Sequence, residues 1–240
     1  MKRIPLIILL IVVTTSFSNA QVLISLLLGD KLNSGKVEFG LDGGLALTNI
    51  PAAPQSGIRP AFDLGFYFDF DLDKSKRVFL HTGVIVKSPM GTTGLAPYSL
   101  GNAELDQLFA GGKVERSMSY YSVPILIKYK FHKDFFVEAG PQLGLLNKGV
   151  DEFTVTIKDK NDLTYVNDVE DQFKKIDAGV TVGLGCKLLH GTGIILGVRQ
   201  YFGLTNILKD SSLGDYQNSA FYIYAGIRIL GIKKKPETEK

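Results

Sequence analysis

The chain has 240 residues, a length that suits one large domain or two small ones. Hydrophobic residues make up 45% and charged residues 21%, with a formal net charge of +3, which excludes a disordered chain and a strongly basic nucleic-acid surface. The single cysteine excludes an intramolecular disulfide framework and any multi-cysteine metal motif. The 26 glycines, 15 phenylalanines and 10 tyrosines favour β-structure over a helical bundle.

Residues 1–20 have the pattern of a secretory signal peptide. Lys2 and Arg3 form a charged start, residues 6–13 are apolar, and a small-residue cleavage site ends at Ala20. The alternative is an uncleaved anchor, but the apolar run is far shorter than the roughly 20 residues of a spanning helix. Cleavage would leave 25 basic residues (27 − 2) against 24 acidic ones, a net charge of +1, so we expect no electrostatic attraction to a polyanion or to a lipid surface.

The chain after residue 35 contains eight segments in which apolar and polar residues alternate with a period of two, as in half-buried β-strands. In the second segment, for example, Phe62, Leu64 and Phe66 share one face, while Asp63 and Gly65 share the other. The eight segments are 36–48, 61–72, 77–87, 121–131, 135–146, 176–188, 194–204 and 221–232. Each is about as long as the ~9–11 residues of a strand that crosses a bilayer.

The connections between these segments alternate in length. Three are tight (73–76, 132–134 and 189–193) and four are longer (49–60, 88–120, 147–175 and 205–220). Outer-membrane barrels have this alternation, with short periplasmic turns and long outer loops. The sequence therefore predicts an all-β fold, an eight-stranded antiparallel up-and-down transmembrane β-barrel over 36–232, in a Gram-negative outer membrane with both termini periplasmic.

The polar face of the segments is rich in glycine and in charges of both signs. Glycines beside large side chains suit a narrow lumen, whereas the solvated outer face of a secreted soluble barrel, which is the alternative, would not need them. The charges expected in the lumen are Glu38, Asp42, Asp63, Asp69, Lys87, Lys128, Lys130, Glu138, Asp177, Lys187, Arg199 and Arg228. We expect them to neutralise one another and the lumen to be closed by side chains.

The tight turns predict which residues lie opposite each other, although a register slip of two would change the pairs. The first hairpin pairs Asp63 with Lys87, Asp69 with His81, and Tyr67 with Gly83. The second pairs Lys128 with Glu138. The third pairs Arg199 with Gly183 and Tyr201 with Thr181.

Several stretches have no single interpretation. Residues 21–35 form a short N-terminal periplasmic segment, in which the apolar 22–28 could be a short helix, an extra strand turn or a lid. Residues 153–167 predict a hairpin that either extends neighbouring strands above the membrane or, as the less favoured alternative, makes ten strands.

Asn102 is expected to cap a helix in which Leu105, Leu108 and Phe109 share a face. Residues 233–240 form a charged periplasmic tail.

Four runs carry a resemblance to a known family. They are Gly29-Asp30-Lys31-Leu32-Asn33-Ser34, Tyr121-Ser122-Val123-Pro124-Ile125-Leu126-Ile127-Lys128-Tyr129, Ala139-Gly140-Pro141-Gln142 and Arg199-Gln200-Tyr201-Phe202-Gly203-Leu204-Thr205-Asn206-Ile207. With these the chain resembles the PorT-like outer-membrane β-barrel family of Bacteroidetes over most of its mature length. The resemblance implies an eight-stranded barrel. The family takes its name from a component of protein secretion across the outer membrane, and it supplies no catalytic or binding residues.

The candidate chemistry is sparse, and the sequence predicts no catalytic, cofactor-binding or metal-ligating residues. His132 and His190 fall in tight turns and His81 in the lumen, so the three histidines share no metal site. No Gly-x-Ser-x-Gly motif is present. Cys186 falls on the outward face, as a small apolar residue would.

We therefore expect a non-enzymatic outer-membrane barrel, monomeric and surrounded by outer-membrane lipid, that acts as a structural or interaction component of the envelope. Its partners would be envelope or secretion-complex proteins, with no cofactor and no nucleic acid. The alternatives are an outer-membrane lipid-modifying enzyme and a small-solute porin.

Overall fold

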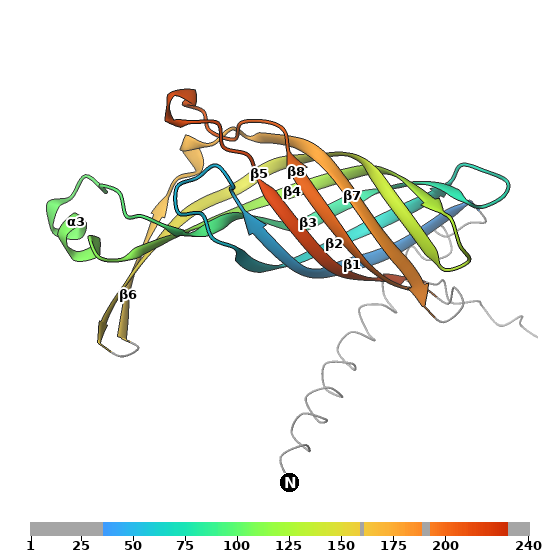
Figure 1. Cartoon of the computed structure of the whole chain (residues 1–240), viewed down its shortest axis with the longest axis horizontal. Helices are drawn as coiled ribbons and strands as arrows, with labels where there is room; N and C mark the ends of the chain where they lie inside the picture. Colours follow the sequence, from blue (N-terminus) through green and yellow to red (C-terminus); the bar gives the residue numbers. More distant parts are fainter. Residues whose placement is uncertain (1–35, 159–160, 189–192, 230–240) are drawn as a thin grey trace, which may run out of the picture.

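The computed structural model describes residues 36–158, 161–188 and 193–229, which form nine strands and three short helices (Figure 1). The strands are β1 (Val37–Asn49), β2 (Arg59–Asp71), β3 (Val78–Leu95), β4 (Lys113–Lys130), β5 (Phe135–Lys158), β6 (Asn161–Asp168), β7 (Ile176–Leu188), β8 (Ile194–Gly203) and β9 (Ser219–Arg228). The helices are α3 (Ala103–Phe109) and the 3-10 helices η2 (Glu170–Gln172) and η4 (Ser211–Leu213). Within these ranges no helix is long and apolar enough to cross a membrane.

Eight of the strands close into an antiparallel barrel. Each pairs with its neighbour along the chain, β5 pairs with β7, and the β1–β9 pair completes the ring. The ninth strand, β6, pairs with β5 alone among the described strands. The predicted eight-stranded barrel is confirmed, and the ten-strand alternative is wrong because the return arm of the 153–167 hairpin never joins the ring.

The two faces of the strands separate as the alternation predicts. Ile125 and Val182 point outward and are each 41% exposed, whereas Lys128 and Arg199 on the opposite face are 1% and 6% exposed. An aqueous fold would bury the first pair and expose the second, because ionised groups stay buried only with partners. The apolar face is therefore the outside of the barrel, and the charged face lines its interior.

The hairpin registers confirm all predicted pairs but one. Asp69 lies opposite His81 and Lys128 opposite Glu138, and the pairs Tyr67–Gly83, Arg199–Gly183 and Tyr201–Thr181 also form.

The Asp63–Lys87 pair is wrong because a register irregularity in β3 places Lys87 opposite Leu64. The same shift moves Lys87 from the lumen to the outside, where its ammonium lies 5.4 Å from the centre of the Phe62 ring. The other charges predicted for the lumen occupy inward-facing positions of their strands.

Three strands extend well beyond the predicted segments. β3 continues to Leu95, β4 begins at Lys113, and β5 runs for 24 residues to Lys158, so much of the predicted loops 88–120 and 147–175 is strand. The outward residues of these extensions are polar, such as Glu115 and Glu152, and the apolar alternation that marks a strand within lipid therefore stops.

The predicted loop helix forms as α3, and the Asn102 side chain accepts hydrogen bonds from the backbone N–H groups of Glu104 and Leu105. Phe109 is buried and Leu105 packs against the core, but Leu108 points away and is 45% exposed. The shared face predicted for all three residues is thus wrong for Leu108. The predictions for residues 1–35, His190 and 233–240 lie outside the described residues.

Candidate functional site

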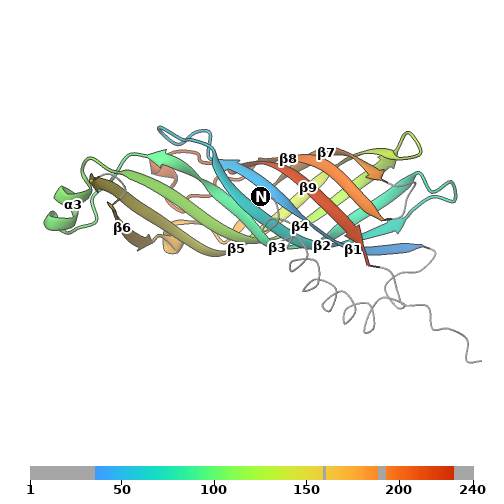
Figure 2. The same ribbon diagram turned by 90° about the horizontal axis from the view of Figure 1, so that it is seen from below.

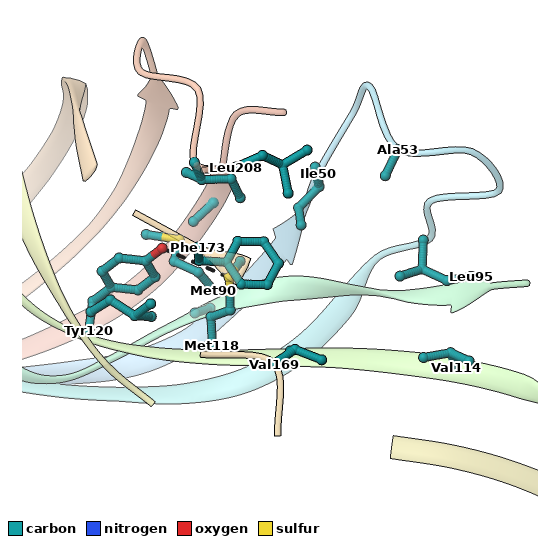
Figure 3. Packing of buried hydrophobic residues seen from close by; sticks show 14 of the residues in the cluster. Ile50, Ala53, Met90, Leu95, Val114, Met118, Tyr120, Val169, Phe173 and Leu208 are labelled. Atoms are coloured by element: carbon teal, nitrogen blue, oxygen red, sulfur yellow. Dashed lines mark hydrogen bonds between the residues drawn. The ribbon is translucent and has the colours of Figure 1, made fainter. Parts of the chain in front are cut away.

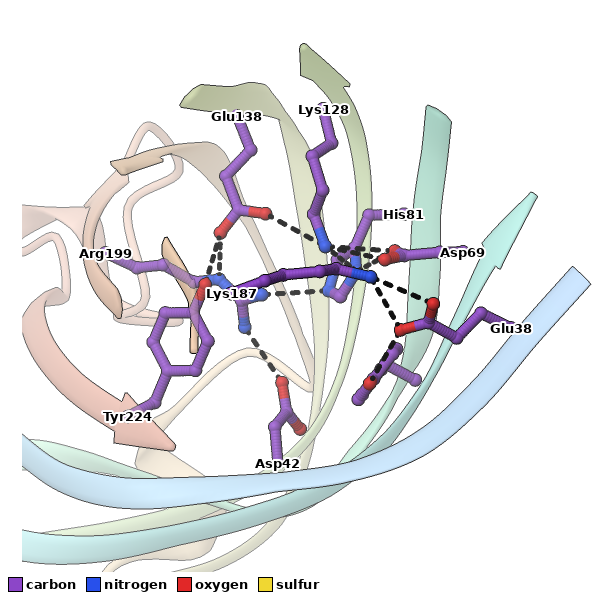
Figure 4. Close-up of polar contacts among 10 residues, drawn as sticks. Glu38, Asp42, Asp69, His81, Lys128, Glu138, Lys187, Arg199 and Tyr224 are labelled. Carbon is purple, nitrogen blue, oxygen red and sulfur yellow. Dashed lines mark hydrogen bonds and ion pairs between the residues drawn. The ribbon is translucent and has the colours of Figure 1, made fainter. Parts of the chain in front are cut away.

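The half of the barrel interior that lies nearer the tight turns is filled by a network of charged side chains (Figure 4). Its centre is Arg199 on β8, whose guanidinium reaches three strands that are not adjacent to β8. It donates to Glu138 Oε1 on β5 at 2.5 Å, to Asp42 Oδ2 on β1 at 3.1 Å and to His81 Nε2 on β3 at 2.9 Å. These contacts cross the lumen, so the Arg199 side chain occupies it rather than lining it.

A second group of the network surrounds Asp69. Lys128 Nζ donates to both carboxylate oxygens of Asp69, at 3.0 and 2.9 Å, and His81 Nδ1 lies 2.6 Å from Oδ1. Because Arg199 donates to Nε2 of His81, the Nδ1 atom carries the proton that Asp69 accepts. His81 thus joins the two groups as a neutral bridge, with each ring nitrogen occupied.

Aromatic rings fill the space beside these charges. Tyr67 on β2 lies over Gly40 of β1, and Tyr224 on β9 lies over Gly197 of β8, so that any side chain on either glycine would meet the ring. The Tyr224 ring also lies 4.0 Å from the Arg199 guanidinium carbon, and its hydroxyl donates to Glu138 at 3.1 Å. The glycines on the inward face therefore allow the large side chains that close the lumen.

The half of the interior nearer the long loops is mainly apolar (Figure 3). Met90 and Met118 come from β3 and β4, and the segments that flank β7 and β8 add Phe173 and Leu208. A backbone bridge joins Phe173 to Leu208, so the two loop segments pack over the barrel together. This half is a mainly hydrophobic core, built partly by loops that fold into the mouth, and it also holds buried polar groups such as Asn218, which donates a hydrogen bond of 2.8 Å to Asp177.

Beyond the ring, β3, β4, β5 and β6 continue as one sheet. We call this sheet, together with α3, the loop-end extension; Figure 2 shows it leaving the barrel on the side of α3. Its inner face packs Phe109 of α3 against Phe153 and Tyr165, with ring centres 6.0 and 6.3 Å from that of Phe109. The extension therefore has a small core of its own and one solvent-facing side.

A buried ion pair holds the base of the loop-end extension. Arg116 donates to both carboxylate oxygens of Asp151, at 2.8 and 2.6 Å, and Tyr98 donates to Oδ2 at 2.9 Å. Asn167 on β6 in turn donates to the Tyr98 hydroxyl at 3.0 Å. Burial, reinforced by the Asp151 carboxylate, raises the pKa of Tyr98 to about 12.

The structure places the predicted chemical residues far apart. His81 lies within the network of charged side chains nearer the tight turns, while His132 is exposed in the turn between β4 and β5. Cys186 is half-buried on the outward side of β7. Among the described residues no group of three or more His, Cys, Asp or Glu side chains could hold a metal ion.

Sequence reasoning missed the Arg116–Asp151 pair and its partner Tyr98, because both charges were assigned to loops. The signal was present, because β4 alternates buried residues with exposed or half-buried ones and so continues its inward face through Val114, Arg116, Met118 and Tyr120. Polar members of an apolar series are easily read as loop residues.

The sequence of residues 19–209 matches the family described as outer membrane protein beta-barrel domain. The chain belongs to this family. It is thus an outer-membrane β-barrel protein, as the distribution of its apolar and charged faces requires. No match to a curated protein sequence was found.

Solved structures of small outer-membrane proteins are similar to this barrel. Ail, the attachment invasion locus protein of Yersinia pestis, matches at 12% identity with a TM-score of 0.42, over 80% of this chain and 99% of its own. Neisserial surface protein A matches at 9% identity and 0.38, over 79% and 96%. OprG from Pseudomonas aeruginosa matches at 13% identity and 0.32, over 80% and 93%.

Proposed function

We propose that this outer-membrane protein is a closed, monomeric and non-enzymatic barrel that acts as an interaction component of the cell envelope through its loop-end extension. The observation that carries the proposal is the position of Arg199, which bridges β1, β3 and β5 across the lumen. A pore wide enough for a solute would have to break these buried ion pairs, and leaving one partner uncompensated costs about 3–5 kcal/mol.

The loop-end extension supports an interaction role because the barrel does not need it to cross the membrane. A spanning strand requires ~9–11 residues, whereas β4 has 18 and β5 has 24. A sheet with its own packed face and a buried Arg116–Asp151 pair presents a fixed surface to a partner. In our proposal this end faces outward from the cell, and the tight turns and both termini are periplasmic.

The finer form of the proposal follows the PorT-like resemblance, which suggests a role beside proteins of a Bacteroidetes secretion complex. The environment of His81 favours such a role over lipid modification. A general base must reach its substrate, but both ring nitrogens of His81 are occupied within the closed lumen. His132, which is exposed, lies at the opposite end from the long loops.

Two measurements test the proposal. The purified protein in planar bilayers should show no stepwise conductance, and deletion of its gene should leave the masses of the outer-membrane lipids unchanged. Stable single-channel steps would establish a porin instead, and a defined mass shift in a lipid would establish an enzyme.

The interaction role is tested by shortening the hairpin between β5 and β6. Because Thr154 lies opposite Thr164, replacing residues 155–163 with Asn-Gly preserves the register of the remaining pairs. Crosslinking in intact cells should capture envelope proteins with the native chain and lose them with the shortened one. The control Leu213→Ser, on exposed η4, should retain capture. Equal capture by the shortened chain would contradict the proposal.

A further inference from the structure

A cavity of about 440 Å³ lies at the turn end, between the β2–β3 turn and the β4–β5 turn. The two turns meet at the start of the β3–β4 pair, where the Lys130 backbone N–H donates to the Arg77 carbonyl at 2.8 Å. The lining residues are Ser75, Lys76, Arg77, Lys130, Phe131, His132 and Lys133. Two separate turns thus contribute to one concave surface.

The charged side chains that line this turn-end cavity are all cationic. The lining contains four cationic side chains and a histidine but no carboxylate. In the described part of the chain, Lys76, Arg77 and Lys133 make no ion pair, and Lys130 packs against a ring, with its ammonium 4.2 Å from the centre of Phe79. Asp73, within the β2–β3 turn, accepts a hydrogen bond from Ser75 and also interacts electrostatically with Arg77. Lys76 and Lys130 also line a neighbouring cavity that contains Glu38, Asp69 and Asp71. Cations gathered on one concave surface that has no carboxylate in its own lining favour a bound anion.

The surroundings of the cavity indicate what kind of anion fits. Phe131 lines it and is 57% exposed on the outside of the barrel, where its ring lies 6.3 Å from that of Phe135. Leu72, before the other turn, is 55% exposed on the same outer surface. Aromatic girdles of this kind mark the level of the headgroups in a membrane. The cavity therefore lies where phosphate groups and acyl chains meet.

We propose that this turn-end cavity binds the phosphate headgroup of an anionic phospholipid in the leaflet that surrounds the tight turns. Arg77 and Lys133 approach the phosphate from the two turns, and the acyl chains run down the outer surface past Phe131. A zwitterionic lipid is disfavoured because its own ammonium offsets the charge that the cations recognise. The site is independent of the role proposed for the loop-end extension and of which side of the membrane the turns face.

Native mass spectrometry of the full chain in a neutral detergent tests the site. Phosphatidylglycerol and phosphatidylcholine with identical acyl chains are the probes, and phosphatidylglycerol should be retained preferentially as a one-to-one adduct. Each cation near a membrane surface contributes about 1 kcal/mol, a roughly fivefold effect, so Arg77→Gln with Lys133→Gln should weaken binding roughly 25-fold. The matched control, Lys148→Gln with Lys158→Gln in the loop-end extension, removes the same charge and should have no effect.

Three outcomes would overturn the proposal. They are equal retention of the two lipids, unchanged phosphatidylglycerol binding by the turn variant, and an equal loss in the control pair. Inorganic phosphate is added as a competitor, and complete displacement of the lipid at millimolar phosphate would show that the site takes a free anion. A gel that compares unboiled and boiled samples verifies that each variant is folded, because all four substituted side chains are exposed.

Discussion

The two halves of the barrel interior are filled by different kinds of side chain, mainly ion pairs in one and mainly apolar groups in the other. Near the tight turns, Arg199, Lys128 and their carboxylates fill the lumen, whereas near the long loops Met90, Met118 and Phe173 do so. Buried charges are stable only as complete sets, since one missing partner leaves an uncompensated ion. Apolar groups tolerate gradual loss, because each buried methylene contributes separately. The turn-end half should therefore fail abruptly on mutation and the loop-end half by degrees.

The largest effect is expected for Arg199→Ala. The change leaves Asp42 buried without its cation and Glu138 with Lys128 alone, 3.8 Å away, and the free energy of unfolding should fall by about 3–5 kcal/mol. Urea unfolding in lipid vesicles, followed by far-ultraviolet circular dichroism, measures the loss. Arg199→Lys keeps the charge but cannot reach all three acceptors, so its free energy of unfolding should lie between those of the native protein and of Arg199→Ala. An unfolding midpoint equal to that of the native protein would contradict the ion-pair network.

The next effect contrasts the inside of the barrel with its outside. Ile125→Arg places an arginine, which the lumen accommodates, on the lipid-facing side of β4. The free energy of folding into the membrane should become less favourable by about 2–4 kcal/mol if this position lies near the bilayer midplane. Reduced insertion into liposomes is the readout. Ser119→Arg, on the same face of β4 but nearer the long loops, should insert normally. Equal insertion by both arginine variants would mean that the outward face of β4 does not touch hydrocarbon.

A smaller effect is expected in the apolar half. Ile207 is fully buried there, and Ile207→Val removes one methylene, at a cost of about 0.5–1.5 kcal/mol. Hydrogen exchange should become faster in segment 205–218 and stay unchanged near Lys128. Faster exchange throughout the barrel would show that the two halves unfold as one unit.

The smallest effect concerns the hydroxyl of Tyr98 at the base of the loop-end extension. Tyr98→Phe removes the hydrogen bonds to Asp151 and Asn167 and should cost about 0.5 kcal/mol, the low end for such bonds because the ring is partly exposed. Trypsin should cleave the extension faster. Tyr129→Phe, on the outward face of β4, is the control and should be cleaved at the native rate.

The same hydroxyl gives a pH dependence with a defined sign. The folded pKa of Tyr98 is about 12, above the ordinary value of 10, so its contribution is complete below pH 10 and is lost as the pH rises through 12. Protease protection of the loop-end extension in the native protein should fall over this window, by more than in the Tyr98→Phe protein. Identical profiles for the two proteins would rule out the Tyr98 contacts as the cause.

Local patterns were sufficient for much of the fold. The alternation through Phe62, Leu64 and Phe66 identified the outward face, and the tight turns gave the Asp69–His81 and Lys128–Glu138 pairs. A short turn fixes which residues lie opposite each other, so such pairs follow from counting. Lys87 shows the limit of such counting. A register irregularity in β3 moved Lys87 to the outward face, and no local pattern in the sequence predicts that irregularity.

The sequence by itself determined the number of crossing strands, the face of the strand residues other than Lys87 and the mixed charge of the lumen, since these depend mainly on period and turn length. Only the tertiary structure decided that Arg199 would reach Glu138, Asp42 and His81, because those residues come from strands that are not its neighbours. It likewise decided that β3 to β6 would continue past the ring, and that two turns far apart in the chain would place their cations around one cavity. Closure of the barrel produces the first of these, and the pairing of β3 to β6 along their full length produces the other two; no local pattern connects the residues concerned.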